Sequence, residues 1–338
     1  MALPTETTYG LAVRADQAEP LDALRALGCG TSESTGWHRP AWHTTSVEAD
    51  LGQAELSAVA RRLAKRYWPG PLTLVLRGDQ ASAAFAGLEP LAEDGWTAMR
   101  VPSHGTTEAI LEAAPFPVAF LGAQLPGRDP AVTAGEVRQL FPAAQVPLIV
   151  DGGSASLRSP SSVLALGPGR FEVLRSGIIT EDEMRKAAGL SLLFVCTGNT
   201  CRSPMAEGLA RAALRRSLED ETVFGFKVAS AGVYAGNGAP PSEHAVTALG
   251  DRGIDLSQHA SRPAIDVEVA AADHVYCLTR SHRAALLGML SPNATDRVEL
   301  LDPQGRDVPD PFGGPLEVYR ETADVLESFI EARLTDWV

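Results

Sequence analysis

The feature that most constrains the fold of this chain is an apolar stretch that runs directly into a cysteine. Residues 192–195 read Leu-Leu-Phe-Val, and Cys196 follows them. A loop that contains Gly198 comes next, and residues 205–216 have the composition of a helix. An apolar run, a glycine-containing loop and a helical segment together predict a strand that leads through a tight loop into a helix.

This strand–loop–helix unit predicts a binding site for a phosphate group. Backbone N–H groups at the start of a helix point toward the loop and favour an anion. The same positive field favours the thiolate form of Cys196, and the planar guanidinium of Arg202 matches two phosphate oxygens. A thiolate that faces a bound phosphoryl group can accept it covalently. The alternative interpretation is a buried structural cysteine with an arginine nearby by chance.

A second signal lies near the end of the sequence, where residues 308–314 read Val-Pro-Asp-Pro-Phe-Gly-Gly. The prolines and glycines predict a turn-rich loop that presents Asp310 close to Phe312. A carboxylic acid on such a loop can donate a proton to the leaving group of a phosphoryl transfer. Taken alone, Asp310 is better explained as a turn or helix-cap residue, but the cysteine loop favours the catalytic interpretation.

Residues 191–338 resemble a low-molecular-weight protein phosphatase of the tyrosine and arginine phosphatase family. The cysteine loop and the Asp-Pro-Phe-Gly-Gly loop carry the resemblance, with matching peptides at 230–232, 255–262 and 272–278 between them. The resemblance implies a central parallel sheet flanked by helices. It also implies a phosphorylated protein as substrate, a phosphocysteine intermediate, and no metal or organic cofactor.

The same resemblance implies a role for each residue of the site. Cys196 is expected to be the nucleophile, Arg202 the phosphate clamp, and Asp310 the general acid and then the base. Asn199, Ser203 and Ser230 are expected to hold the loop in shape. The residues expected to bind the phosphate are Thr197, Gly198, Asn199, Thr200, Cys201 and Ser203.

Thr200 bears on the choice of substrate. Tyrosine-directed members of the family usually carry a bulky apolar residue at this position, whereas a threonine resembles the arginine phosphatase branch. A hydroxyl can accept a hydrogen bond from a guanidinium, and Phe312 offers a flat wall for a guanidinium or an aromatic ring. We therefore predict that phosphoarginine is favoured over phosphotyrosine. Cys201 is either a passive second cysteine or a disulfide partner that protects Cys196 from irreversible oxidation.

The composition sets broad limits. A chain of 338 residues, 45% apolar and 21% charged, is typical of two globular domains. No apolar run is long enough to span a membrane, and no signal peptide is visible. Four scattered cysteines suit a reducing cytoplasm, and the seven histidines show no metal-ligand spacing. A net charge of −13 argues against direct nucleic-acid binding through a general basic surface.

Residues 1–190 alternate short apolar runs with glycines and prolines. Mixed strands and helices in this half predict an α/β or α+β domain. A short helix over residues 180–188 is expected between the halves, with Thr180 as its N-cap and Glu183 three positions later. The predicted strands are 72–76, 97–101, 118–121 and 148–150, and the predicted helices are 20–27, 56–67, 106–113 and 134–141.

Residues 1–185 resemble the YrdC-like family, which makes threonylcarbamoyl-adenylate from threonine, bicarbonate and ATP for a tRNA modification. Peptides in the family's order carry the resemblance, among them Pro-Thr-Glu-Thr-Thr-Tyr-Gly at 4–10 and Met-Arg-Val-Pro at 99–102. The resemblance implies a twisted α/β sheet around a concave, positively lined cavity for ATP and threonine. Thr5 and Tyr9 are expected near the threonine site. The residues expected to contact the nucleotide are Arg39, Arg100, Ser161 and Arg175.

The first half also departs from the signatures of this family. Trp37 stands where the family has the lysine of Lys-x-Arg-Pro, and Gly122 and Gln124 stand where it has Ser-x-Asn. A tryptophan cannot replace a cation that faces the phosphates, so much of the binding energy for a triphosphate is lost. Only three residues precede the Pro-Thr-Glu-Thr peptide, which predicts that the sheet lacks an edge strand or that the start codon is misassigned. Three functions stay open: synthesis of threonylcarbamoyl-adenylate, nucleotide sensing or partner docking, and an inherited scaffold without chemistry.

Overall fold

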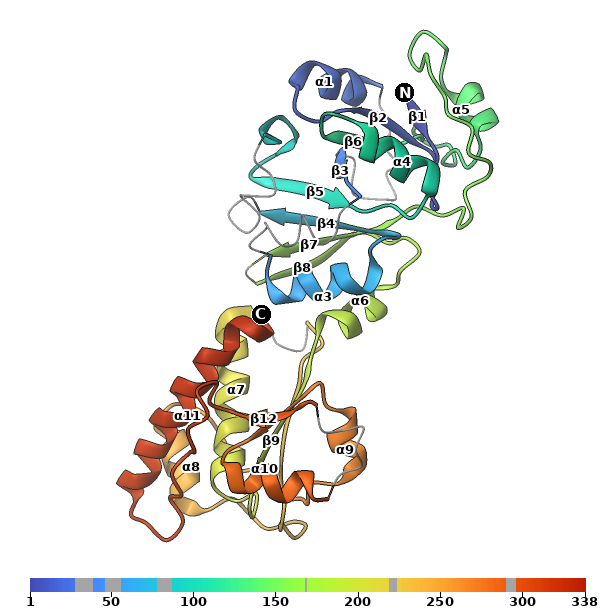
Figure 1. Ribbon diagram of the computed structural model, residues 1–338. Helices are drawn as coiled ribbons and strands as arrows, with labels where there is room; N and C mark the ends of the chain where they lie inside the picture. Colours follow the sequence, from blue (N-terminus) through green and yellow to red (C-terminus); the bar gives the residue numbers. More distant parts are fainter. Residues whose placement is uncertain (28–38, 46–55, 78–86, 168, 219–223, 290–295) are drawn as a thin grey trace. The chain divides into compact units, whose positions relative to one another are not determined.

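The computed structural model of the chain describes residues 1–27, 39–45, 56–77, 87–167, 169–218, 224–289 and 296–338. The chain divides into two compact units, Met1–Ala187 and Ala188–Val338 (Figure 1). Each unit has its own sheet and its own buried apolar core.

At the centre of the second unit, four strands of the described residues form a parallel sheet in the order β10–β9–β11–β12. Parallel strands are covered on both faces, which is why β9 is a continuous apolar run. Because the strands run in one direction, their carboxyl ends meet at one edge of the sheet, where Cys196 lies beside Gly232. The strands are β9 Ser191–Cys196, β10 Lys227–Gly232, β11 His274–Cys277 and β12 Val298–Leu300.

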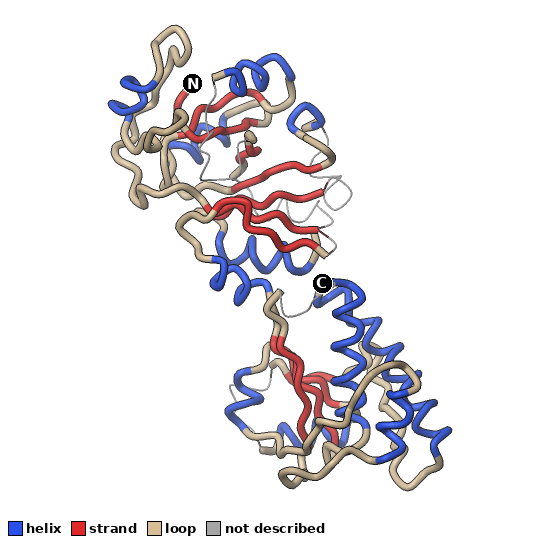
Figure 2. Tube along the Cα trace, turned by 180° about the vertical axis from the view of Figure 1, so that it is seen from behind, coloured by secondary structure: helices blue, strands red, loops and turns tan. Residues whose placement is uncertain are grey.

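Helices cover both faces of this sheet (Figures 1 and 2). α7, α8 and α11 lie together on one face, and α9 and α10 lie on the other. The predicted central parallel sheet flanked by helices is therefore confirmed. The helices are α7 Arg202–Leu218, α8 Glu243–Gly250, α9 Asp266–Ala271, α10 Arg280–Leu287 and α11 Leu316–Trp337.

The last helix, α11, closes the core on its face of the sheet. Trp337 is fully buried and lies edge-on to Phe194 of β9. Its indole Nε1 donates a hydrogen bond of 2.9 Å to the hydroxyl of Tyr276 on β11. A buried indole N–H needs such a partner, because an unpaired polar group in an apolar core is costly. This packing holds β9 in place, and the end of β9 carries Cys196.

Among the described residues of the first unit, eight strands form a mixed sheet in the order β1–β2–β6–β3–β5–β4–β7–β8. The pairs β3–β5 and β4–β7 are parallel, and the other neighbouring pairs are antiparallel. The predicted mixed α/β character of this half is confirmed. The strands are β1 Ala2–Leu3, β2 Gly10–Arg14, β3 Ala41–His43, β4 Leu72–Arg77, β5 Trp96–Arg100, β6 Val118–Gly122, β7 Ser162–Gly167 and β8 Arg170–Arg175.

Two helices of the first unit begin with reciprocal capping contacts. Thr133 and Glu136 exchange hydrogen bonds at the start of α5, and Thr180 and Glu183 do so at the start of α6. Such contacts satisfy backbone N–H groups that have no partner within the helix. The helices are α1 Ala18–Ala26, α3 Ala58–Tyr67, the short 3₁₀ helix η2 Glu89–Leu91, α4 Gly105–Ala113, α5 Ala134–Leu140 and α6 Glu181–Ala188.

The predicted helices and the predicted strands 72–76, 97–101 and 118–121 are confirmed, with small shifts at their ends. The predicted strand 148–150 is wrong. Ile149 forms a single bridge to Ala2, because Pro147 before it and two glycines after it interrupt a longer ladder. The prediction of a missing edge strand is also wrong, since residues 2–3 pair with β2. The prediction missed β1 and β3, because two or three residues show no periodicity. It also missed the longer strands β2, β7 and β8.

Candidate active site

The loop between β9 and α7 brings the predicted catalytic residues together. Cys196 is the last residue of β9 and is 3% exposed, and Arg202 is the first residue of α7. Asn199 has a left-handed backbone with a φ of 54°, which asparagine tolerates better than most residues. Gly232 lets the loop approach β10, because a Cβ at this position would lie 2.5 Å from the carbonyl oxygen of Thr197.

Two hydrogen-bond partners face the thiol of Cys196. The hydroxyl oxygen of Ser203 lies 2.9 Å from Sγ, and the backbone N–H of Asn199 donates to Sγ over 3.3 Å. Both groups can donate to a thiolate, the form of cysteine that acts as a nucleophile. The sulfur thus lies at the amino end of α7, where helix amides favour negative charge.

Asn199 ties the loop to its surroundings through its whole side chain. Its Nδ2 donates to the hydroxyls of Ser203 and Ser230 at 2.9 Å each, and its Oδ1 accepts from the backbone N–H of Arg262. The Ser230 hydroxyl in turn donates to the carboxylate of Glu207 over 2.7 Å. The three residues predicted to support the loop therefore lie in one buried network, which holds the left-handed backbone in place.

Asp310 reaches the loop from the turn-rich segment that precedes α11. Its Oδ2 accepts a hydrogen bond of 2.7 Å from Nη2 of Arg202, and its Oδ1 accepts one from the backbone N–H of Phe312. The arginine side chain is 7% exposed and the aspartate side chain is 56% exposed. The ion pair therefore places the cation inside the protein and the carboxylate toward solvent.

A pocket of about 230 Å³ opens beside this ion pair. Phe312 lines it while remaining 79% exposed. The thiols of Cys196 and Cys201 are both free, so no disulfide joins them in this structure. The lining residues are Cys196, Thr197, Gly198, Thr200, Cys201, Arg202, Asp310 and Phe312.

Three residues that contact the loop were not predicted as part of the site. His259 contacts the loop backbone at 2.8 Å, Tyr319 contacts a loop thiol at 3.6 Å, and His282 contacts the hydroxyl of Thr197 at 2.9 Å. They come from three separate segments of the chain. No spacing in the sequence signals them, because each is a single residue that packing brings to the loop.

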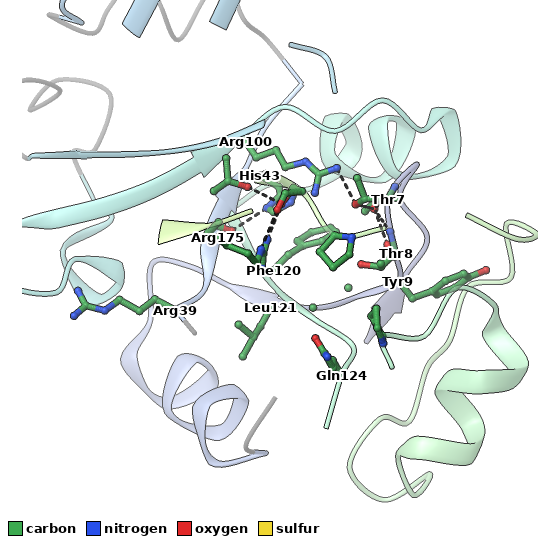
Figure 3. A pocket seen from close by; sticks show the side chains of 18 residues that line it. Thr7, Thr8, Tyr9, Arg39, His43, Arg100, Phe120, Leu121, Gln124 and Arg175 are labelled. Atoms are coloured by element: carbon green, nitrogen blue, oxygen red, sulfur yellow. Dashed lines mark hydrogen bonds between the residues drawn. The ribbon is translucent and has the colours of Figure 1, made fainter. Parts of the chain in front are cut away.

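A second cavity lies in the first unit and is drawn in Figure 3. It has a volume of about 60 Å³, and a neighbouring hollow of about 520 Å³ shares Pro130 and Pro160 with it. His43 and Phe120, which were not predicted, stack on one another in its wall with ring centroids 4.1 Å apart. The residues predicted for a ligand site in this half all line the cavity: Thr5, Tyr9, Arg39, Arg100, Ser161 and Arg175.

Two of the arginines around this cavity are paired with carboxylates. Arg100 is buried and donates from Nη2 to Glu6 over 2.6 Å. Arg39 points away from the centre of the cavity in Figure 3 and pairs with Glu93 over 2.9 Å. Their positive charges are therefore largely compensated within the protein.

Arg175 has no carboxylate partner among the residues that the structure describes. It donates to the carbonyl oxygen and the hydroxyl of Ser161, which carry no charge. Burial and the nearby Arg100 cation lower the pKa of Arg175 to about 10, so it stays charged at neutral pH. The segments of this unit outside the described residues contain no lysine or arginine. Within the described part of this unit, a cavity with one such cation suits a small anion better than a triphosphate.

The departures from the expected signature concern the same cavity. Gly122 and Gln124 both line it, so the short polar contacts of a Ser-x-Asn signature are missing from this wall. Gln124 donates its side-chain N–H to the carbonyl oxygen of Arg128 over 2.8 Å. Trp37 lies outside the described residues.

The described part of the chain offers neither a metal-binding cluster nor a membrane-spanning helix. Within it, no group of three or more histidine, cysteine, aspartate or glutamate side chains could hold a metal ion. None of its helices has both the length and the apolar character needed to cross a lipid bilayer.

Comparison with known proteins gives a match for the second unit. Residues 191–336 match the family model for low molecular weight phosphotyrosine protein phosphatase. The unit is 39% identical over 144 residues to a protein-arginine-phosphatase of Geobacillus stearothermophilus, a match that covers 41% of this chain and 90% of the relative. It is 37% identical over 144 residues to the protein-arginine-phosphatase of Bacillus subtilis, covering 42% of this chain and 92% of the relative.

A separate match covers the first unit. Residues 1–177 match the Sua5/YciO/YrdC family model, described as telomere recombination. The chain is 30% identical over 192 residues to the threonylcarbamoyl-AMP synthase of Pyrococcus abyssi. This match covers 56% of the chain and 53% of the relative, so the chain spans about half the length of that synthase.

Proposed function

The chain belongs to the low molecular weight phosphotyrosine protein phosphatase family over residues 191–336 and to the Sua5/YciO/YrdC family over residues 1–177, and we propose that its second unit is a cysteine-dependent protein phosphatase. We further propose that it prefers phosphoarginine to phosphotyrosine. The main support for the proposal is that Cys196, Arg202 and Asp310 line one pocket.

In the first proposed step, Sγ of Cys196 attacks phosphorus, and the bond between phosphorus and the leaving group breaks. Arg202 and the loop N–H groups stabilise the charge on the phosphoryl oxygens. Asp310 gives its proton to the leaving nitrogen or oxygen. The phosphoryl group stays on the sulfur as phosphocysteine.

In the second proposed step, water attacks the phosphorus of the phosphocysteine. Asp310, now a carboxylate, accepts a proton from that water. The bond between phosphorus and sulfur breaks, which releases inorganic phosphate and restores the thiolate. The two steps use no metal and no organic cofactor.

The ion pair between Arg202 and Asp310 must open before the first step can occur. A phosphoryl group that enters the pocket competes with the Asp310 carboxylate for the guanidinium fork of Arg202. Binding of the substrate thereby frees Asp310 from Arg202. The carboxylate then takes up a proton from solvent, and this is the proton that it gives to the leaving group. The exposed position of the Asp310 side chain leaves room for this movement.

The preference for phosphoarginine rests on Thr200. Its side chain lines the pocket, and among the described residues its hydroxyl makes only a distant contact of 3.7 Å to the sulfur of Cys201. The hydroxyl therefore keeps lone pairs that can accept a guanidinium N–H. The ring of Phe312 lines the same pocket and can stack on a planar guanidinium.

Phosphate release from matched phosphoarginine and phosphotyrosine peptides tests the proposal, with C196S as the blank. We expect the higher kcat/KM for the phosphoarginine peptide. A higher value for phosphotyrosine would keep the phosphatase and overturn the substrate class. Release no faster than the blank from both peptides would reject the phosphatase itself.

Replacing Thr200 with isoleucine should move the preference toward phosphotyrosine. Isoleucine removes the hydroxyl that meets the guanidinium and supplies an apolar surface for an aromatic ring. We expect the ratio of kcat/KM for phosphoarginine over phosphotyrosine to fall by about ten- to a hundredfold, the size of one lost hydrogen bond to a charged group. T247I, at an exposed position of α8, is the matched control. An unchanged ratio in T200I would refute the role of Thr200.

For the first unit we propose a module that binds a small ligand without turning over ATP. The relatives matched there are threonylcarbamoyl-AMP synthases, and the predicted contact residues line one cavity, so a synthase is the alternative function. Arg175 lines this cavity and has no carboxylate partner among the described residues, which favours a ligand with one phosphate or carboxylate group over a triphosphate.

Release of pyrophosphate from ATP and bicarbonate distinguishes the two functions. We expect no release that depends on threonine, whereas L-threonine or AMP should raise the melting temperature of the full chain. R175M should remove this shift, and R170M, half-exposed on the same strand, should keep it. Threonine-dependent release would establish the synthase, and no shift with any ligand would leave a scaffold without chemistry.

A further inference from the structure

His282 is a buried histidine that the proposed phosphatase steps do not use. It lies in the first turn of α10 and is 4% exposed. The strand that leads into α10 is β11, which pairs in parallel with β9, so that Cys277 lies beside Val195. The carboxyl ends of these two strands therefore bring the start of α10 to the loop that follows Cys196.

The imidazole of His282 makes one hydrogen bond within the described residues, and this bond is directed at the loop. Its Nε2 lies 2.9 Å from the hydroxyl oxygen of Thr197, while its Nδ1 is buried and has no partner there. A buried polar atom without a partner is unfavourable, so an apolar side chain would fill this space at lower cost. The histidine therefore contributes the hydrogen bond to Thr197, which an apolar side chain could not make.

The imidazole is neutral near pH 7. Burial lowers the pKa of His282 to about 4, helped by the Arg202 cation and opposed by Asp310 and Asp307. A neutral imidazole offers one N–H and one lone pair, so it can hold the hydroxyl of Thr197 in either direction. The contact is therefore an uncharged hydrogen bond, suited to positioning rather than to carrying charge.

Thr197 directly follows the nucleophile and is held from two sides. Its carbonyl oxygen accepts from the backbone N–H of Tyr234 over 3.0 Å, and its hydroxyl meets His282. Asn199 anchors the loop two residues later through the network with Ser203. Because the loop is held at these two residues, its N–H groups stay directed toward one phosphate position. Preorganised donors of this kind stabilise the transition state of a phosphoryl transfer.

We propose that His282 is a positioning residue of the phosphatase, which acts through Thr197 to hold the start of the phosphate-binding loop in its reactive shape. The inference rests on the phosphatase function proposed for the second unit. Loss of the contact should lower both kcat and the affinity for inorganic phosphate, because both depend on where the loop amides point.

The test compares H282L, H282Q, T197V and the double variant T197V/H282L in the full chain. We expect H282L and T197V each to lower kcat by about three- to tenfold, the value of one neutral hydrogen bond. The double variant should lose no more than either single variant, because both remove the same contact. H282Q, whose amide can reach the same hydroxyl, should recover most of the loss.

H274L is the matched control, since His274 begins β11 at the end of the strand far from the loop. It should keep the kcat of the unchanged chain. A folded H282L with unchanged kcat would overturn the inference, and so would losses that multiply in the double variant. Thr197 is exposed, so T197V should fold. It can therefore test the contact even if H282L fails to fold.

A second readout separates this inference from the proposed function. This readout measures what concentration of inorganic phosphate is needed to protect Cys196 from alkylation by iodoacetamide. If the chain shows no turnover that depends on Cys196, the proposed function fails, yet H282L and T197V should still raise this concentration by about three- to tenfold. Unchanged protection in both variants would overturn the role of His282.

Discussion

Replacing Cys196 with serine is expected to abolish phosphate release while the chain still binds phosphate. A serine hydroxyl is not ionised at neutral pH, so the loop keeps its N–H groups and Arg202 but loses the nucleophile. We expect kcat to fall on the order of 10⁴-fold or more, as in enzymes that lose a covalent nucleophile. The measurements are phosphate release from a phosphoarginine peptide and phosphate binding by titration calorimetry.

Cys277 supplies the control for this experiment. It is fully buried at the end of β11, and burial raises the pKa of its thiol to about 12. Such a thiol is not ionised at neutral pH and cannot replace Cys196 as nucleophile. C277A should therefore keep its turnover, with thermal unfolding measured alongside. Substantial turnover by C196S, or loss of turnover by a folded C277A, would contradict attack by Cys196.

Replacing Asp310 with asparagine is expected to lower kcat for the phosphoarginine peptide by about 10²- to 10⁴-fold, the usual contribution of a general acid. Asparagine keeps the size of the side chain but has no acidic proton to give. The loss in kcat/KM, which reports the steps up to departure of the leaving group, should be smaller for p-nitrophenyl phosphate, because its leaving group is stable as an anion and needs little protonation. Steady-state kinetics on both substrates measure this difference.

Asp324 offers a matched control for D310N. It is an exposed aspartate on α11 that pairs with the more buried Arg252, so it repeats the type of ion pair away from the pocket. D324N should keep kcat within about twofold, since an exposed ion pair of this kind contributes little. If D310N lowered kcat/KM equally for both leaving groups, the variant would act by disturbing the loop rather than by removing an acid.

The phosphate-binding loop could be predicted because its parts are contiguous. An apolar strand, a glycine-containing turn and a helix follow one another between residues 191 and 218. Their backbone geometry is set by neighbouring residues, so Cys196 and Arg202 had to face the same loop. The prediction of a parallel sheet rested on the family resemblance, and the pairing of β9 with β10 and β11 bears it out.

In the first unit, by contrast, the properties of the candidate site depend on residues that are far apart in the sequence. The residues expected around its cavity do line it, yet their electrostatic balance could not be read from the sequence. Arg100 is compensated by Glu6, which lies 94 residues earlier in the chain. Whether a cation in a cavity is free to bind an anion depends on such distant carboxylates. Among the described residues, Arg175 has none and donates to Ser161 instead.

By itself, the sequence determined most helices of the first half, three of its strands and the loop that carries Cys196, because these depend on residues that are near neighbours in the chain. Only the tertiary structure decided which distant side chains meet. Arg202 pairs with Asp310 across 108 residues, and Thr197 meets His282 across 85 residues. Such contacts follow from strand order, register and helix packing, which no local pattern encodes.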